Sequence, residues 1–150
     1  MTDSGPSEAR PVAVLRAVSV LRSLGVPHAG FAEREAEAGS WFADWTGEIP
    51  GTEGSPGSEV YVGLMGAAPD APSARLLLDD WEFEDVTAED VGELLRGVFT
   101  GAATITGRRT FPFTATRVLE CAVGPRRYSA AKPYDADERP QPWEQPLTSR

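Results

Sequence analysis

The sequence has few of the side chains that most enzymes use. Among its 150 residues there is one histidine, one cysteine and one lysine, and there is no asparagine. A nucleophilic triad or a histidine metal site would have to be built on His28, with no second imidazole to help. Cys121 cannot form an internal disulfide, which fits a cytoplasmic protein. We therefore expect a protein that is not an enzyme and that has neither a cofactor nor a bound metal.

Long apolar runs are also missing. No stretch approaches the ~20 apolar residues of a membrane helix, and residues 1–10 lack the apolar core of a secretory signal. The chain is 41% hydrophobic and 25% charged, with a mean hydropathy of −0.29. This is the composition of one globular domain, which at this length buries about 70% of its extended surface without a disulfide or metal. We expect a flexible N-terminus over 1–10, a single domain over 11–131 and a Pro-rich, extended or disordered tail over 132–150.

The charge of the chain is acidic and unevenly distributed. The formal net charge is −9, from 14 basic and 23 acidic residues. Residues 1–100 contain 6 basic and 18 acidic residues and carry −12, whereas residues 101–150 contain 8 basic and 5 acidic residues and carry +3. An acidic body repels the phosphate backbone of nucleic acids and attracts basic protein surfaces. The predicted partner is a protein with a basic surface, and neither nucleic acid nor a membrane is expected to bind.

Hydrophobic periodicity predicts an α+β fold. Apolar side chains recur every three or four residues over 11–24 and 87–99, which predicts two helices. A strand pair turning near Gly39 is expected within residues 28–49. Further apolar or alternating runs predict strands at 59–65, 75–83, 103–108, 116–123 and 128–131. Strands this close in sequence favour a mostly antiparallel sheet of about five to seven strands, with the two helices packed on one face.

The most unusual feature is a run of acidic residues with no base among them. It lies between Arg75 and Arg96 and consists of Asp79, Asp80, Glu82, Glu84, Asp85, Glu89, Asp90 and Glu93. One interpretation is a partner-binding ridge at the end of a strand and the start of a helix. A second is a divalent-cation site, although the spacing is not that of a calcium loop. A third is an ordinary solvated face. The ridge is the predicted partner-binding site.

Tryptophans provide an alternative binding site. Trp41 and Trp45 are expected on one face of a strand and Trp81 on another strand, so the three could line a pocket for a small molecule or a peptide. They could equally be core residues. Trp143 stands apart in the Pro-rich tail, either as an anchor that docks on this domain or on another protein, or as an incidental residue of a disordered segment.

Together these features predict a non-enzymatic protein-binding module, an acidic adaptor that recognises a basic partner surface. In size, acidity and lack of catalytic side chains the chain is similar to bacterial immunity proteins and small chaperone-like adaptors, an analogy that implies protein binding and nothing finer. The alternative function is small-molecule or peptide binding at the three tryptophans. The residual enzymatic alternative is a metal-dependent activity of Asp80, Glu82 and Glu84, which alternate along one strand.

Overall fold

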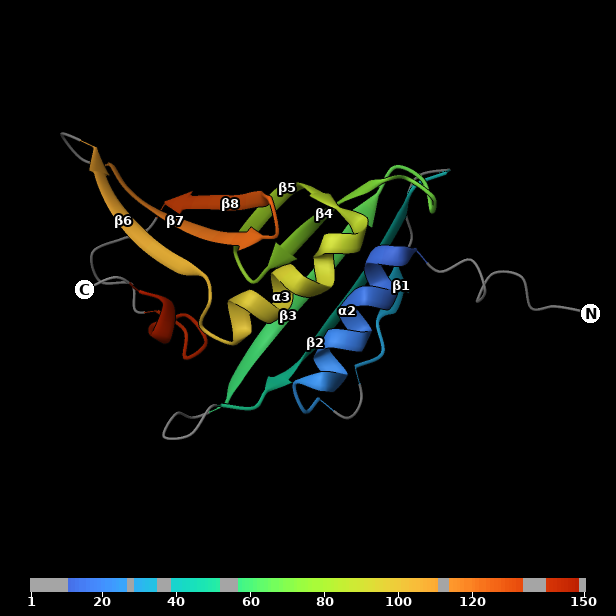
Figure 1. The fold of residues 1–150 in the computed structure, drawn as a ribbon, viewed down its shortest axis with the longest axis horizontal. Coiled ribbons are helices and arrows are strands. Elements are labelled where there is room, and N and C mark those ends of the chain that lie inside the picture. Colours follow the sequence, from blue (N-terminus) through green and yellow to red (C-terminus); the bar gives the residue numbers. More distant parts are fainter. Residues whose placement is uncertain are drawn as a thin grey trace, which may run out of the picture.

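Within the residues that it describes, the computed structural model in Figure 1 contains two antiparallel sheets and two α-helices. It describes residues 11–26, 29–34, 39–51, 57–110, 114–133 and 140–148. The expected flexible N-terminus and His28 lie outside the described residues. The predicted α+β class and the antiparallel pairing are confirmed, with the strands divided between a five-stranded and a three-stranded sheet.

The five-stranded sheet is a meander in which each strand pairs with its neighbour in sequence. Its strands are β1 (Ala32–Arg34), β2 (Trp41–Ile49), β3 (Ser58–Gly66), β4 (Ser73–Leu78) and β5 (Trp81–Thr87). The predicted strand pair around Gly39 is β1 and β2, and Gly39 has a positive φ of 86°, a conformation that glycine adopts readily. Short connections hold every pairing antiparallel.

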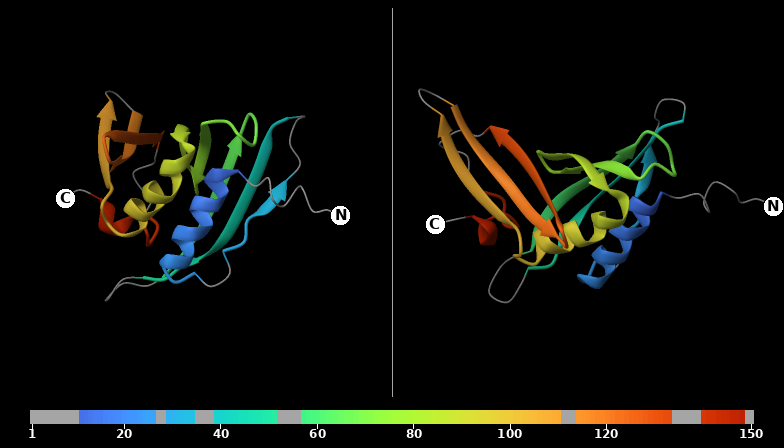
Figure 2. Two further views of the ribbon diagram at one scale, coloured as in Figure 1. Left: turned by 45° about the vertical axis from the view of Figure 1, so that its right-hand side comes forward. Right: turned by 45° about the horizontal axis from the view of Figure 1, so that its top comes forward.

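Both helices cover the same face of this sheet, as the two views in Figure 2 show. They are α2 (Val12–Ser23) and α3 (Val91–Phe99), the second preceded by a 3-10 turn, η1 (Ala88–Asp90). The helices approach closely at Gly92, where a Cβ would lie 3.1 Å from the backbone oxygen of Arg16. Alternate strand residues, such as Val62, Leu64 and Leu76, point into this layer and are fully buried. Each such side chain contributes about 1.5–3 kcal/mol by leaving water.

The three-stranded sheet extends from the side of the first sheet. It consists of β6 (Thr104–Thr110), β7 (Thr114–Val123) and β8 (Arg126–Pro133), with β7 in the centre. β8 lies beside β5 in Figure 1, and the Tyr128 hydroxyl accepts a hydrogen bond from the Thr87 backbone N–H at 3.3 Å. Buried Ile105, Leu119 and Ala130 share the face of this sheet on which β7 packs against α3, so the two sheets share one core.

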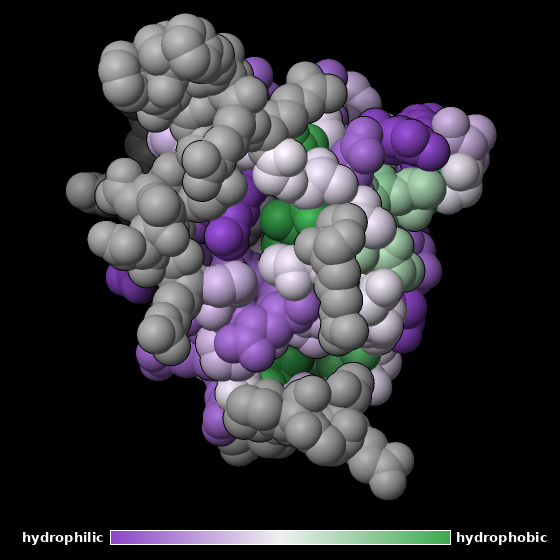
Figure 3. Space-filling view, turned by 90° about the vertical axis from the view of Figure 1, so that its left-hand side faces the viewer, coloured by the Kyte–Doolittle hydropathy of each residue, from purple (hydrophilic) through white to green (hydrophobic). Residues whose placement is uncertain are grey.

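Residues 140–148, which we call the C-terminal strap, pack beside the three-stranded sheet. They end in a 3-10 turn, η2 (Gln145–Leu147), and Thr148 forms an isolated parallel bridge with Ile105. Trp143 is 6% exposed and meets the Phe99 ring edge to face, with centroids 5.7 Å apart. Trp143 is therefore an anchor docked on this domain, which was one of the alternatives for it. On the visible part of this end, hydrophobic patches are separated by hydrophilic residues (Figure 3).

Buried polar contacts fasten the strap to the rest of the protein. The Glu144 carboxylate is 3% exposed and accepts a hydrogen bond of 2.7 Å from the indole N–H of Trp81. The ammonium of Lys132 lies 3.8 Å from the same carboxylate and 4.9 Å from the centre of the Trp81 ring. The indole N–H of Trp143 in turn donates to Asp79 at 2.7 Å. These contacts explain why a segment so rich in proline is held against the domain.

Replacing Glu144 tests this fastening. We expect Glu144→Ala to lower the free energy of unfolding by about 3 kcal/mol, because it leaves the Trp81 indole N–H without its buried acceptor and removes the carboxylate facing Lys132. Glu144→Gln retains an acceptor oxygen and is expected to cost less. Urea unfolding followed by circular dichroism measures both values. The control is Glu93→Ala, an exposed member of an ion pair on α3, expected to cost less than about 1 kcal/mol. If Glu144→Ala and Glu93→Ala lowered the free energy of unfolding equally, the buried contacts of Glu144 would not stabilise the folded protein.

Candidate functional site

The face of the five-stranded sheet that points away from the helices is the candidate functional surface. We call it the outer sheet face, and its side chains include those of Phe42, Asp44, Tyr61, Met65, Arg75, Leu77, Glu82 and Glu84. All of them are half-buried or exposed, whereas their neighbours along each strand are largely buried. This alternation follows from the two-residue period of a strand with one covered face.

The predicted acidic ridge begins in the turn between β4 and β5. Asp79 has a φ of 50°, the left-handed conformation that a tight hairpin turn needs. Its carboxylate accepts hydrogen bonds from the Tyr61 backbone N–H at 3.0 Å and from the Trp143 indole at 2.7 Å. Asp79 is therefore engaged in structural contacts, while Asp80 in the same turn is exposed.

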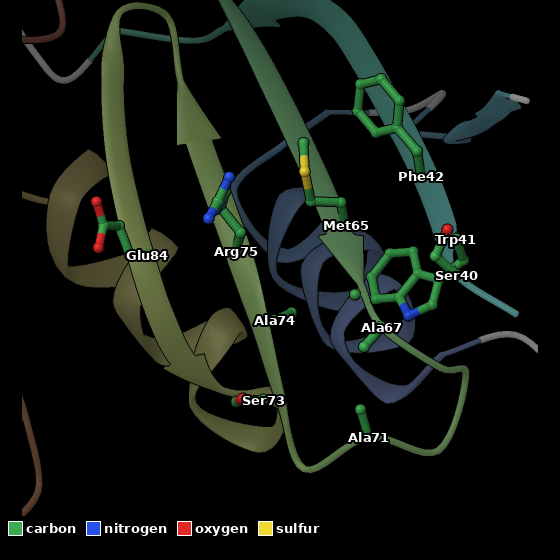
Figure 4. A pocket seen from close by; sticks show the side chains of 11 residues that line it. Ser40, Trp41, Phe42, Met65, Ala67, Ala71, Ser73, Ala74, Arg75 and Glu84 are labelled. Atoms are coloured by element: carbon green, nitrogen blue, oxygen red, sulfur yellow. The ribbon is translucent and has the colours of Figure 1, made fainter. Parts of the chain in front are cut away.

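The middle of the acidic run lies along β5. Glu82 forms an ion pair of 3.1 Å with Arg75, with both side chains nearly half exposed. β5 carries one extra residue at this point, so that Glu84 and Asp85 together oppose Arg75. Both are exposed, and Glu84 projects from the outer sheet face (Figure 4). We call the exposed acids Asp80, Glu82, Glu84 and Asp85 the acidic margin.

The end of the acidic run lies elsewhere in the molecule. Glu89 is exposed and Asp90 partly so, both in the 3-10 turn before α3. Asp90 forms a 3.0 Å ion pair with Arg126 and accepts a 2.7 Å hydrogen bond from the Tyr128 hydroxyl. Glu93 lies on α3, in the layer that covers the opposite side of the sheet, and pairs with Arg96. The eight carboxylates therefore do not share one surface, and the acidic margin is the part that borders the outer sheet face.

The three tryptophans that were expected to form a pocket are separated. Trp81 is fully buried and reaches the strap. Trp45 is 7% exposed and lies against Gly47, where a Cβ would overlap the indole ring. Trp41 is half-buried at the start of β2 and donates from its indole N–H to the Ala68 carbonyl at 3.0 Å. Of the three, only Trp41 borders the outer sheet face.

A cavity of about 480 Å³ opens beside Trp41 at one end of the outer sheet face (Figure 4). We call it the outer pocket. It is lined by Ser40, Trp41, Phe42, Met65, Gly66, Ala67, Ala71, Ser73, Ala74, Arg75 and Glu84. Its volume lies in the range of about 300–1,000 Å³ that is typical of ligand sites. Phe42, Met65 and Arg75 were not predicted as site residues, although their positions on the exposed side of alternating strands are the signal that places them together.

A polar network lies further along the same face. The Asp44 carboxylate forms an ion pair with the Arg34 guanidinium at 2.9 Å and accepts a hydrogen bond from the Tyr61 hydroxyl at 3.1 Å. Burial raises the pKa of Tyr61 above its ordinary value of 10.0, and the hydrogen bond and negative charge of Asp44 raise it further, while Arg34 acts in the opposite direction. The neutral phenol is thus the form that the folded protein stabilises.

Substitution of Asp44 tests this network. We expect Asp44→Asn to lower the pKa of Tyr61, because the phenolate would no longer face a negative charge. Absorbance of the phenolate followed against pH measures the shift, and Tyr61→Phe identifies the Tyr61 signal among the three tyrosines. The raised pKa contributes stability below pH 10 that is lost as the pH rises through the folded-state value. An unchanged or higher pKa in Asp44→Asn would contradict the assignment.

The remaining chemistry of the described residues is limited. No three His, Cys, Asp or Glu side chains among them converge as metal ligands do. Burial raises the pKa of the Cys121 thiol, which favours its less reactive protonated form. None of the described helices is long and apolar enough to cross a membrane.

Comparisons of the chain with protein-family models, with curated proteins and with solved structures give no match. Function is therefore inferred from the outer sheet face itself.

Proposed function

We propose that the protein is a non-enzymatic binding module that receives a basic segment of a partner protein on its outer sheet face. The observation that carries this proposal is the one-sided layering of the fold. Both helices lie on one face of the five-stranded sheet, and the other face presents apolar side chains, a cavity and the acidic margin. A surface that combines apolar contact area with a charged border is suited to recognising another protein.

Charge supports a basic partner. The whole chain carries −9, and the first 100 residues, which contain the outer sheet face, carry −12. Arg75 lines the pocket, and its charge is offset by Glu82 at 3.1 Å. Glu84 has no ion pair within the described part of the chain, so its carboxylate is available to a partner. Complementary charge speeds association and excludes partners of the wrong sign.

Reversing charge on the acidic margin tests the proposal. Peptides selected from a random display library on the purified protein at low salt are expected to be rich in Lys and Arg. The double variant Glu82→Lys with Glu84→Lys is expected to bind them at least tenfold more weakly, because it turns the attraction into repulsion. Fluorescence anisotropy measures the dissociation constants, and binding to the unmodified protein is expected to weaken as salt screens the charges.

The matched control is Glu93→Lys, which reverses an exposed acid on the helical side of the sheet. Its dissociation constant for the selected peptides is expected to stay within about twofold of the value for the unmodified protein. Selection of neutral or acidic peptides, or an equal loss from Glu93→Lys and from the double variant, would contradict the proposal. Circular dichroism verifies that each variant is folded.

A further inference from the structure

The outer pocket has the features of a preformed anchor site. The Trp41 ring is held in place by its hydrogen bond to the Ala68 carbonyl and by contact with Gly66, where a Cβ would overlap the indole. Phe42 and Met65 are paired opposite each other on β2 and β3 and provide an apolar floor. A rigid apolar cavity binds a large side chain at little cost in conformational entropy.

The charged groups at the pocket indicate which charge a bound segment should carry close to its apolar side chain. Arg75 and Glu84 both line the cavity, from β4 and β5 (Figure 4). Arg75 is engaged by Glu82, whereas Glu84 has no ion pair among the described residues. A partner that places a cation at this position gains a new charge pair at Glu84, while one that places an anion meets this carboxylate and the rest of the acidic margin.

The sheet also sets the distance between the apolar floor of the pocket and the Glu84 carboxylate. The apolar floor lies on β2 and β3 and Glu84 lies on β5, which follows β4 in the sheet. Adjacent strands are about 4.8 Å apart, so β3 and β5 are separated by about 10 Å. An extended peptide that crosses the strands advances about 3.3 Å per residue and covers this distance in about three residues.

We infer that the outer pocket binds one large apolar side chain of an extended peptide segment that carries Lys or Arg two or three residues away. This inference rests on the proposed function and names the chemistry of the recognised segment. The test uses fluorescein-labelled peptides of Gly and Ser that carry one Phe and one Lys at spacings from one to five residues. Parallel peptides replace the Phe by Ser or the Lys by Glu. Anisotropy titration of the full chain is expected to give the tightest binding at a spacing of two or three, and at least tenfold weaker binding when either residue is replaced.

Two variants of the protein separate the pocket from the charge. Ala71→Trp fills the cavity from its loop side, and Met65→Gln makes its floor polar at similar size. Each is expected to weaken binding of the Phe–Lys peptide at least tenfold. The control, Ala122→Trp, adds the same bulk at an exposed position on β7 and is expected to bind as the unmodified protein does.

The outcomes distinguish this inference from the proposed function. In one outcome, peptide binding weakens with salt and in the double variant Glu82→Lys with Glu84→Lys, but its affinity does not depend on the Phe, on the spacing or on either pocket variant. That outcome overturns the pocket inference and leaves the proposed function standing. If no Lys-containing peptide binds in a way that depends on the acidic margin, both are overturned.

Discussion

The structure depends on one constraint: two helices cover a single face of a five-stranded sheet. α2 and α3 pack against each other so closely at Gly92 that they form one layer, and alternate residues of β2–β5 are buried beneath it. The side chains of the same strands that point outward are covered by neither of the described helices, so they must be compatible with water. The chain meets this requirement with ion pairs, such as Arg34 with Asp44 and Arg75 with Glu82, set among half-buried apolar side chains. The resulting mixed surface is the basis of the proposed binding function.

The C-terminal strap joins the two sheets near the turn between β4 and β5. Its Glu144 reaches Trp81 at the start of β5 and Lys132 at the end of β8, so a single buried carboxylate contacts both sheets. Burying an ion pair contributes little net stability, but removing one partner is costly. The strap also fixes Asp79 through Trp143, and Asp79 shapes the turn from which the acidic margin begins. The position of that margin is thus linked to the packing of the strap.

Periodicity in the sequence predicted the helices and most strands, but the single strand expected over 75–83 was wrong, because a turn at Asp79 and Asp80 divides that segment between β4 and β5. The helical spacing over 11–24 and 87–99 corresponds to α2 and to η1 with α3. Alternation placed Trp41 and Trp45 on one face of a strand and left open whether they line a pocket or the core, and Trp45 is buried. The strap was harder to recognise, because its prolines indicate an extended segment. Its order comes from a long-range hydrogen bond between Glu144 and Trp81, which are far apart in the sequence.

The candidate site was predicted only in part, for topological reasons. Eight acids that are nearly consecutive in sequence follow the chain from the outer sheet face, through η1, to the helical layer, so proximity in sequence does not become proximity in space. Their basic partners Arg75 and Arg126 come from other strands. Trp41 lines the pocket although it is in phase with the inward residues Ala43 and Trp45 along β2, because it begins its strand and its indole reaches the Ala68 carbonyl in the loop after β3.

The most direct measurement is a two-dimensional NMR titration of the isotopically labelled protein with an unlabelled Phe–Lys peptide. Binding at the outer sheet face predicts that amide shifts concentrate at residues 40–42, 65–75 and 82–85, which line or border the outer pocket. The exposed side of α2 and the distal part of the three-stranded sheet are expected to remain unchanged. Shifts concentrated on the helices or on the three-stranded sheet would show that the partner binds elsewhere, and would contradict a binding role for the outer sheet face.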